Sequence, residues 1–179
     1  RSNNFKVDPM ISTGSSTLAD YKGSGFDRGH LAPAGDMKWS KPSMDDSFYM
    51  SNMSPQRPGF NRGIWKKLES IIREWAVEYG KLHIVTGPVL EKSHMTIGSN
   101  KVSIPNYYYK VILDYQNPEY KAIGFLLPNQ KSKKHLSNYA LSIDELESTL
   151  NIDFFHLLDD SLEASIESDL DLSLWGLDK

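Results

Sequence analysis

The sequence predicts an α+β fold, with strands in the middle of the chain and helices at several points along it. Between Asn61 and Tyr79, apolar residues recur at helical spacing, which is typical of an amphipathic helix, and Gly80 then ends it. Segments rich in β-branched and aromatic residues follow at 82–88, 107–115 and 120–127. A chain of 179 residues, 39% of them hydrophobic, is long enough for one domain with a substantial core. We therefore expect a single domain over residues 1–179.

The first part of the chain predicts less regular structure. Residues 1–26 are rich in glycine and serine and hold few apolar residues, so we expect an extended loop there. Ser43 is followed closely by two acids and then by aromatic residues. This pattern predicts a short helix over 43–50, with Ser43 as its N-cap and the acids in its first turn.

The later elements have clearer signals. The run 82–88 is apolar and predicts a buried strand. The turn at 117–118 joins the last two β-rich segments, which predicts that they form a hairpin. Ser142 and the acids after it predict the start of a helix, whereas the rest of the segment 142–179 is an acidic, weakly patterned tail.

Composition excludes several kinds of site. No apolar run approaches the roughly 20 residues needed to span a bilayer, and no signal segment opens the chain. Because the sequence has no cysteine, it has no disulfide, thiolate metal site or cysteine nucleophile. The sequence starts at Arg1 rather than at a methionine, which leaves open a leader that precedes it. The side chains that remain for a catalytic or metal site are therefore carboxylates, imidazoles and amides.

Charge is unevenly distributed, although the net charge is only −3. Residues 1–73 hold 11 lysines and arginines against 7 acids, whereas the segment from Asp144 to Asp178 holds 11 acids and neither lysine nor arginine. A polyanion would therefore meet the N-terminal half, provided that the fold keeps the acidic segment on the opposite face. A solvated surface that favours solubility explains the acidic segment equally well.

The run Asp27-Arg28-Gly29-His30 is the first candidate site. A proline and a glycine follow it closely, so the run predicts a strand end that opens into a loop. Gly29 allows another group to approach closely, and His30 would then lie at the rim of a site. Because the ordinary pKa of histidine is about 6.5, a neutral ring is available near pH 7 to accept a proton from water. We interpret the remaining histidines as surface or core residues: His83, His94, His135 and His156.

The expected helix after Asn61 carries an amide, a carboxylate and a guanidinium beside its apolar stripe: Asn61, Glu69 and Arg73. In the first turn, Asn61 would lie near the free N–H groups of the helix N-terminus, which suit phosphate. An amide oxygen is a hard ligand of the kind that Mg²⁺ accepts, and Glu69 could hold the waters of the ion. Arg28 and Arg73 would neutralise charge on a phosphate.

Each of these residues also has a common structural role. Glu69 and Arg73 are four residues apart on a helix, where such pairs usually form a surface ion pair. Asn61 can cap the helix, and Arg28 can pair with a nearby aspartate. Taken one at a time, the structural roles are more common, and only the ordered set of residues favours a functional site.

Three motifs occur in a specific order. They are Asp27-Arg28-Gly29-His30-Leu31-Ala32-Pro33, then Ser51-Asn52-Met53-Ser54-Pro55-Gln56, then Asn61 with Gly63, Trp65, Leu68 and Glu69. Three shorter runs follow them along the chain: Val85-Thr86-Gly87-Pro88, Ile104-Pro105 and Tyr109-Lys110-Val111. With these motifs the chain resembles the DNA/RNA non-specific endonucleases of the endonuclease G type, over roughly residues 5–130.

The resemblance implies a ββα-metal (His-Me finger) fold, in which helices flank a central and mainly antiparallel sheet. It implies that His30 is the general base and that Asn61 is the single direct protein ligand of Mg²⁺. Glu69 would reach the ion through water, and Mn²⁺ or another divalent cation could substitute for Mg²⁺. Arg28 and Arg73 would stabilise the phosphate or the transition state.

The resemblance also implies supporting and substrate-binding positions. Asn52 and Gln56 match motif positions with a supporting role toward the substrate. The family carries a further arginine upstream of the pair that corresponds to Asp8-Pro9, and Arg1 is the only candidate for it. The family has strand sequence before this point that the chain lacks, and a sheet edge would be exposed in consequence.

The expected function is that of a sugar-non-specific endonuclease, which hydrolyses phosphodiester bonds of DNA and RNA by a one-metal mechanism. The alternative is a homologue that binds nucleic acid without cleaving it. Such a homologue would be expected to have lost His30 or Asn61 first, and the sequence has both. An unrelated hydrolase that uses His30 with a carboxylate does not explain the helix that carries Asn61.

The expected partners are DNA and RNA, and the sequence leaves open a protein inhibitor and a homodimer. A non-specific nuclease endangers its own cell, so we expect export or confinement. Of these, a secreted or periplasmic bacterial enzyme is expected rather than a mitochondrial one.

Overall fold

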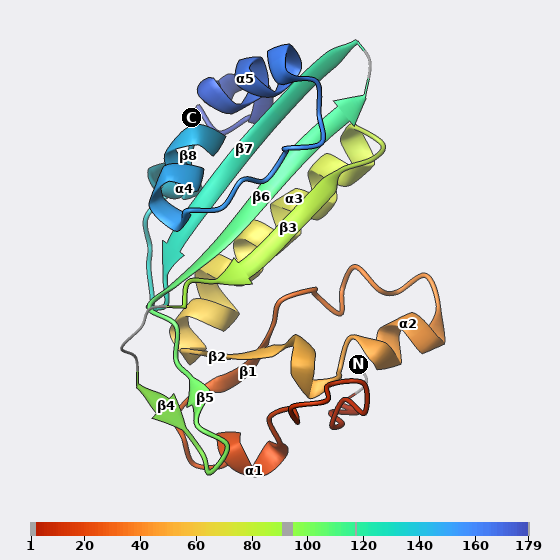
Figure 1. Cartoon of the computed structure of the whole chain (residues 1–179), viewed down its shortest axis with the longest axis vertical. Helices are drawn as coiled ribbons and strands as arrows, with labels where there is room; N and C mark the ends of the chain where they lie inside the picture. The colour runs from red at the N-terminus through yellow and green to blue at the C-terminus, as the bar shows by residue number, and fades with distance from the viewer. Residues whose placement is uncertain (1–2, 91–94, 117, 179) are drawn as a thin grey trace. The chain divides into compact units, whose positions relative to one another are not determined.

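The computed structural model describes residues 3–90, 95–116 and 118–178. It combines helices with antiparallel strands, which confirms the predicted α+β class (Figure 1). The chain divides into two compact units. The first unit comprises Arg1–Glu69, Leu90–Asn106 and Asn129–Ser132, and the second comprises Ser70–Val89, Tyr107–Pro128 and Lys133–Lys179. The single-domain organisation stays a prediction.

Short elements joined by long loops make up the first unit. They are α1 (Leu18–Tyr21), β1 (Asp27–His30), α2 (Lys41–Asp46), η1 (Met50–Asn52), β2 (Met53–Gln56), η2 (Phe60–Trp65), β4 (Thr96–Ile97) and β5 (Val102–Ser103). Strand β1 pairs antiparallel with β2, and β4 pairs antiparallel with β5. One core cluster draws a side chain from each of several separate segments: Tyr21, Met50, Met53, Ile97 and Ile104. This unit therefore depends on contacts between distant parts of the sequence.

The second unit is built on a sheet. Its elements are β3 (His83–Pro88), β6 (Tyr107–Gln116), β7 (Glu119–Pro128), η3 (Leu136–Tyr139), β8 (Ala140–Leu141), α4 (Ile143–Leu150), α5 (Asp160–Ser168) and η4 (Leu172–Trp175). Helix α3 (Lys66–Glu78) begins in the first unit and continues into the second. The strand order is β3-β6-β7-β8, with antiparallel neighbours. Gln116 pairs with Glu119 and Tyr107 with Pro128, which confirms the predicted hairpin.

Helices cover both faces of this sheet (Figure 1). On one face, α4 and α5 pack against β6 and β7 through Val111, Leu113, Ala122, Ile143, Leu146 and Ile166. On the other face, the Trp75 ring of α3 stacks on Phe125, with the ring centroids 6.4 Å apart. Because side chains alternate between the faces of a strand, β6 and β7 are buried on both sides.

Helix α2 begins earlier than the sequence predicts. The Ser40 hydroxyl accepts a hydrogen bond from the backbone N–H of Ser43 at 3.1 Å, so Ser40 is the N-cap. Pro42 fits in the first turn because no intrahelical donor is needed there. The predicted helix over 43–50 capped by Ser43 is therefore wrong in its position, and its acids lie at the end of α2 rather than in the first turn.

Strand β3 is exposed, although its apolar sequence predicts a buried strand. Ile84 and Val85 are each 41% exposed. The reason is the strand order, which places β3 at one end of the sheet, where it pairs with β6. An apolar run shows that a strand forms but does not show whether it lies at the centre or the edge of a sheet.

Both ends of the chain contain more regular structure than the sequence predicts. Within 1–26, α1 forms, and Lys6 makes an isolated bridge with Tyr49. Ser142 caps α4 as predicted, and the tail after it folds into α5 and η4, where Trp175 is buried. Across the described ranges, none of the helices has the length and apolar character that crossing a membrane requires.

Candidate functional site

Strand β1 carries the predicted histidine run. His30 is the last residue of β1 and lies opposite Met53 of β2, so the predicted strand end is confirmed. Gly29 lies under the side chain of Gln56, and a Cβ at this position would overlap the Gln56 amide. The fully buried Gln56 side chain therefore crosses the strand only because the residue beneath it is glycine.

Aromatic rings hold His30 and Arg28. The His30 ring meets the Phe48 ring at 89°, with the centroids 4.9 Å apart. The guanidinium carbon of Arg28 lies 4.4 Å from the centroid of the Phe5 ring, at cation–π distance. Arg28 and His30 are two residues apart in β1 and so share one face of the strand. An imidazole and a guanidinium are thus presented together against an apolar support.

Asn52 fixes the loop that follows His30. Its Oδ1 accepts a hydrogen bond from the backbone N–H of Ala32, and its Nδ2 donates to the carbonyls of Ala32 and Ser47, all at 2.9 Å. The backbone carbonyl of Asn52 accepts a hydrogen bond from the backbone N–H of Leu31 at 3.0 Å. The amide is thus engaged with the backbone, so Asn52 positions the loop beside His30.

The helical segment at Asn61 differs from the regular helix that the sequence predicts over Asn61–Tyr79. Phe60–Trp65 form an irregular helical segment with a kink, and α3 begins only at Lys66. Gly63 has φ −106° and ψ −111°, a non-helical conformation that interrupts this segment. Asn61 therefore lies in an irregular turn before α3 and not in the first turn of a regular helix.

The Asp27 carboxylate holds Asn61 in place. The Nδ2 of Asn61 donates to Oδ2 of Asp27 at 2.8 Å. Arg62 donates to the same carboxylate through Nε at 2.8 Å and Nη2 at 2.6 Å. Because Nδ2 is committed to Asp27, the Oδ1 of Asn61 is the amide atom left for a ligand.

The charge of Asp27 is stabilised by these donors. Burial by itself would raise the pKa of the Asp27 carboxyl, but the hydrogen bonds from Arg62 and Asn61 and the charges of Arg62 and Arg28 outweigh it and lower the pKa. The carboxylate therefore stays ionised as a support for Asn61. The sequence did not predict the contact between Asp27 and Arg62, because these residues are 35 positions apart. Their opposite charges are the only signal in the sequence, and they identify a pair only once β1 is known to lie beside η2.

The remaining predicted residues differ in how they are placed. Glu69 is partly buried in the first turn of α3 and belongs to the first unit. Arg73 belongs to the second unit, where its Nη2 donates to the hydroxyl of Ser70 at 3.1 Å. Arg1 lies outside the described residues. Elements β1, β2 and η2 with their flanking loops thus bring together His30, Arg28, Asn52, Gln56 and Asn61 within the first unit.

The donor atoms of this arrangement fit a hydrated divalent cation. Asn61 offers a neutral oxygen, held in one orientation by Asp27, and Mg²⁺ commonly takes few protein ligands and keeps several waters. Asp27 and His30 stand at the two ends of a strand of four residues, about 10 Å apart along it. Asn61, through its contact with Asp27, and His30 are thus attached to opposite ends of one short strand, which supports a metal ligand and a proton acceptor in one site.

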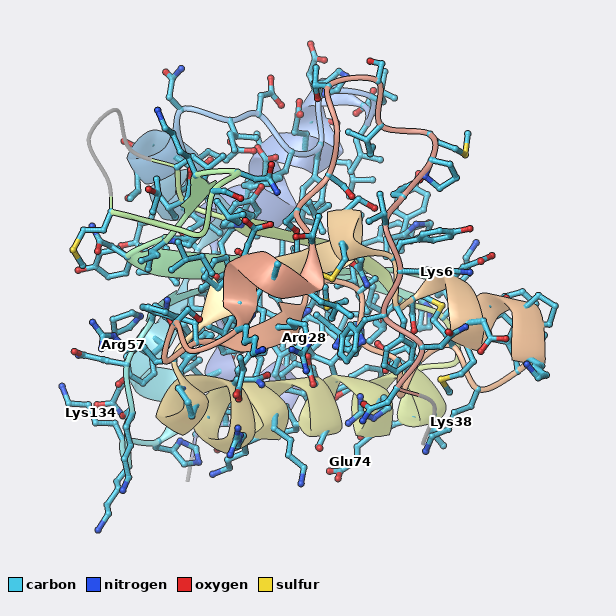
Figure 2. The ribbon with its side chains drawn as sticks, turned by 90° about the horizontal axis from the view of Figure 1, so that it is seen from below. Lys6, Arg28, Lys38, Arg57, Glu74 and Lys134 are labelled. Atoms are coloured by element: carbon cyan, nitrogen blue, oxygen red, sulfur yellow. The ribbon has the colours of Figure 1, made fainter. Side chains whose placement is uncertain are left out.

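Basic side chains of the first unit are drawn in Figure 2, where Lys6, Arg28, Lys38 and Arg57 are labelled. Lys38 and Arg57 are exposed. Lys38 comes after the loop that follows His30, and Arg57 comes directly after β2, so these two charges flank the candidate site in the sequence. A polyanionic ligand would be attracted to them.

Comparison with known proteins identifies relatives along most of the chain. A family model described as DNA/RNA non-specific endonuclease matches residues 1–161. Nuclease C1 of Cunninghamella echinulata var. echinulata is 41% identical over 87% of this chain and 67% of its own length. Mitochondrial nuclease EXOG of Mus musculus is 37% identical over 88% of this chain and 47% of its own length. Bovine mitochondrial endonuclease G is 36% identical over 73% of this chain and 48% of its own.

A solved structure confirms the expected fold. The similar chain comes from a crystal structure of the EndoG/EndoGI complex and has a TM-score of 0.80 and 32% identity, covering 87% of this chain and 69% of that one. Together with the mixed helices and antiparallel strands, this likeness confirms the predicted ββα-metal nuclease fold. The chain spans two thirds of the fungal relative but only about half the length of the animal relatives.

The predicted localisation is wrong. The relatives are a fungal nuclease and mitochondrial animal nucleases, which point to a eukaryotic origin rather than to a secreted or periplasmic bacterial protein. The error has a physical reason: any membrane-bounded compartment keeps a nuclease from the genome, so the need for confinement could not distinguish a mitochondrion from a periplasm.

The comparisons confirm the resemblance and the nuclease class that the sequence predicts. They support a metal-dependent nuclease without identifying the ion. The described residues also include an acidic cluster that could hold a metal, formed by Asp144, Glu147 and Glu167 of the second unit. With a family match over residues 1–161, the chain belongs to the DNA/RNA non-specific endonuclease family.

Proposed function

We propose that the chain is a sugar-non-specific endonuclease that hydrolyses phosphodiester bonds of DNA and RNA with Mg²⁺ as its cofactor. The observation that carries the proposal is the hydrogen bond from Asn61 to Asp27, on the same strand that ends in His30. This hydrogen bond orients the Asn61 side-chain oxygen for a hard cation. His30, the proton acceptor, lies at the other end of the same short strand. Family membership supports the reaction class.

His30 acts as the general base. A water attacks phosphorus, its oxygen forms the new P–O bond, and its proton passes to the imidazole as the bond to the leaving oxygen breaks. The edge-on contact with Phe48 holds the ring in place through the reaction. Arg28, beside His30 on the same face, neutralises charge on the phosphoryl oxygens.

Asn61 is the direct protein ligand of the ion, through Oδ1, and Glu69 reaches it through water. When bound, the ion neutralises developing charge and stabilises the leaving oxygen. Asp27 and Arg62 keep the Asn61 amide oriented. Mn²⁺ or another divalent cation of similar chemistry substitutes for Mg²⁺.

The remaining predicted residues have supporting roles. Arg73 contributes positive charge toward the phosphate, and Arg1 meets the substrate backbone. Asn52 acts by positioning the loop that follows His30, since its side-chain amide is hydrogen-bonded to the backbone of Ala32 and Ser47. Gln56 acts through Gly29, against which it is fully buried. We expect both of these residues to affect turnover more than substrate affinity.

The substrate range follows from the kind of contact. Arginines, an amide and a metal recognise phosphate, which carries no sequence information, and no described helix of the first unit is long enough to read a major groove with its side chains. DNA and RNA should therefore both be cut without sequence preference. Binding should weaken steeply with salt, because each phosphate contact releases counterions.

Digestion assays test the proposal. End-labelled duplex DNA of mixed sequence, single-stranded DNA and structured RNA are incubated with the protein and Mg²⁺, with and without EDTA. All three substrates should be cut at many positions, EDTA should stop cleavage, and Asn61→Ala should lower the rate more than about 100-fold. An exposed control, Arg57→Gln, should change salt dependence more than turnover.

Several outcomes separate the alternatives. Binding of DNA without cleavage in any divalent cation would identify an inactive homologue. Discrete cuts at one sequence, or intact RNA beside degraded DNA, would contradict the lack of specificity. A protein inhibitor is a further candidate partner, because the similar solved structure is an EndoG/EndoGI complex. Titrating that inhibitor into the DNA assay tests it directly.

A further inference from the structure

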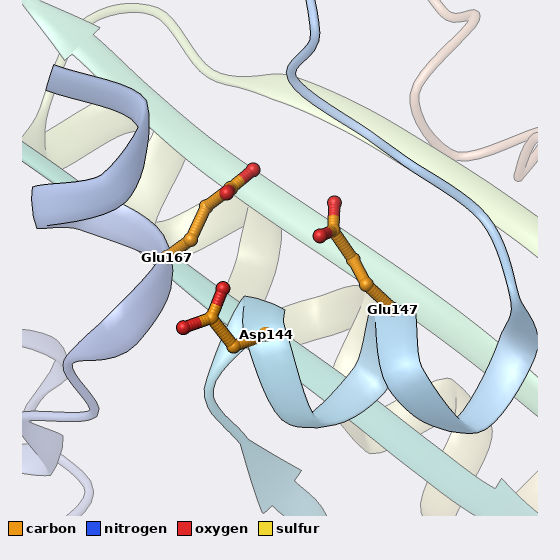
Figure 3. Close-up of side chains that lie close together, drawn as sticks. All are labelled: Asp144, Glu147 and Glu167. Atoms are coloured by element: carbon orange, nitrogen blue, oxygen red, sulfur yellow. The ribbon is translucent and has the colours of Figure 1, made fainter. Parts of the chain in front are cut away.

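Helices α4 and α5 bring three carboxylates together in the second unit. Asp144 and Glu147 come from α4 and Glu167 from α5, and one oxygen of each lies within 4.8 Å of the others. Figure 3 shows the three side chains converging on the space between the two helices. The helices also share an apolar base of Ile143, Leu146 and Ile166 against the sheet, so the carboxylates stand on a fixed support.

Glu167 is buried in this cluster without a partner. The residue is only 7% exposed, and no described residue donates a hydrogen bond to its buried Oε1. Burial, together with the negative charges of Glu147, Glu163, Asp144 and Asp153, raises the pKa of Glu167 to about 7. Residues 135–178 contain neither lysine nor arginine, so these helices supply no cation of their own.

The neighbouring carboxylates are held in place rather than turned away. The Oε1 of Glu147 accepts a hydrogen bond from the backbone N–H of Phe154 at 2.6 Å, which leaves Oε2 for another ligand. Asp144 lies in the first turn of α4, three residues before Glu147 and so on the same face of that helix. Three carboxylates are thus placed close together by helices α4 and α5, a costly arrangement that a bound cation would relieve.

The ligand atoms indicate which cation fits. A site of carboxylate oxygens, without histidine or cysteine, selects hard ions such as Ca²⁺ and Mg²⁺. Two ligands on opposite sides of Ca²⁺ lie up to about 4.8 Å apart, at bonds of about 2.4 Å, whereas the limit for Mg²⁺ is about 4.2 Å. The separations, all within 4.8 Å, do not exceed the limit for Ca²⁺, which also tolerates irregular coordination, whereas Mg²⁺ demands a near-ideal octahedron.

We propose that Asp144, Glu147 and Glu167 form a Ca²⁺ site, separate from the site at Asn61, that joins α4 to α5. Waters complete the coordination, because three carboxylates supply fewer than the six to eight oxygens, roughly, that Ca²⁺ takes. The ion neutralises the cluster and stabilises the C-terminal helices on the sheet.

Thermal unfolding of the intact chain tests the proposal. At pH 8 and constant ionic strength, with NaCl as the reference, Ca²⁺ at about one hundred times its dissociation constant should raise Tm by roughly 5 °C. Glu167→Gln should remove most of this shift. The matched control Asp160→Asn, which removes one exposed acid of α5 outside the cluster, should keep it.

Further variants separate this site from the candidate catalytic one. Asn61→Ala should retain the Ca²⁺ shift in Tm, and calorimetric titration of that variant should find one Ca²⁺ per chain. If Glu167→Gln does not fold, Asp144→Asn at an exposed position should weaken the shift in its place. A shift that persists in Asp144→Asn and Glu167→Gln, or one that disappears in Asn61→Ala, would overturn the proposal. A Tm that Ca²⁺ does not shift beyond the NaCl reference would overturn it as well.

Discussion

Strands β1 and β2 pair over four residues each, whereas β6 and β7 pair over ten. The long pair is rich in apolar side chains and is buried on both faces by helices. In the short pair, aspartate, arginine, glycine and histidine of β1 lie opposite glutamine, proline, serine and methionine of β2, respectively. Its position is fixed by aromatic rings and side-chain hydrogen bonds from other segments.

This difference separates two kinds of contribution to the protein. Burial in the long pair contributes stability, and changes there should lower the free energy of unfolding without changing the chemistry of the site. In the short pair, Ser54 and Gln56 are buried, whereas Asp27, Arg28 and His30 are only partly buried and set the position of reacting groups. Changes there should alter turnover while leaving the fold nearly intact.

Replacing the proposed base should give the largest effect of this kind. His30→Ala should lower turnover on DNA by about 10²- to 10⁴-fold, because a positioned general base contributes that much. Tm should change little, since His30 is only partly buried. Steady-state rates and nucleic-acid binding are measured together, with the exposed His156→Ala as control. Near-normal turnover in His30→Ala would rule out its role as the base.

A core change in the long pair should show the opposite pattern. Phe125 is fully buried against Trp75, so Phe125→Ala should lower the free energy of unfolding by about 3–5 kcal/mol. Turnover per folded molecule should be unchanged at low temperature. Urea unfolding measures the loss, and Val77→Ala, at an 87% exposed position, should stay within about 0.5 kcal/mol. A large loss of turnover in folded Phe125→Ala would show that the two regions are coupled.

The support of Asn61 gives an intermediate case. Asp27→Asn removes the charge that holds Asn61 and Arg62, so the Mg²⁺ concentration for half-maximal activity should rise about 10- to 100-fold. Arg62→Gln leaves the hydrogen bond between Asn61 and Asp27 in place and should have a smaller effect. Titration of activity with Mg²⁺ measures both. Equal effects of the two variants would show that Arg62, and not Asp27 alone, sets the Asn61 orientation.

The cap of α4 should give the smallest effect. Ser142 accepts from the N–H of Glu145 at 3.2 Å, and the Glu145 carboxylate accepts from the N–H of Ser142 at 3.1 Å. Ser142→Ala should cost about 1 kcal/mol of stability, without any change in turnover. Urea unfolding measures it, and Glu145→Ala should give a comparable loss. No loss in either variant would mean that packing of Ile143 and Leu146 alone fixes the helix.

Features set by neighbouring residues could be predicted from the sequence. The end of β1 at His30, the close approach at Gly29, the β6–β7 hairpin and the Ser142 cap all depend on short-range patterns. Two serines three residues apart, Ser40 and Ser43, satisfy the same cap rule, and only the structure distinguishes them.

Features set by distant residues could not be predicted in this way. The break at Gly63 requires backbone angles that an apolar periodicity does not reveal. The exposure of β3 follows from strand order, and the contact of Asp27 with Arg62 joins residues far apart in the chain. The helix α5 lies in an acidic segment whose apolar face is recognisable only against the sheet.

The close contact between Gly29 and Gln56 makes the two positions genetically interdependent. Since any side chain at 29 would occupy the volume of the Gln56 amide, a larger residue there should be accepted only when position 56 becomes smaller. A library that varies position 29 alone should return glycine almost exclusively. A library that varies both positions should also recover compensated pairs, such as alanine at 29 with a small residue at 56, and their fitness would not follow from the single variants.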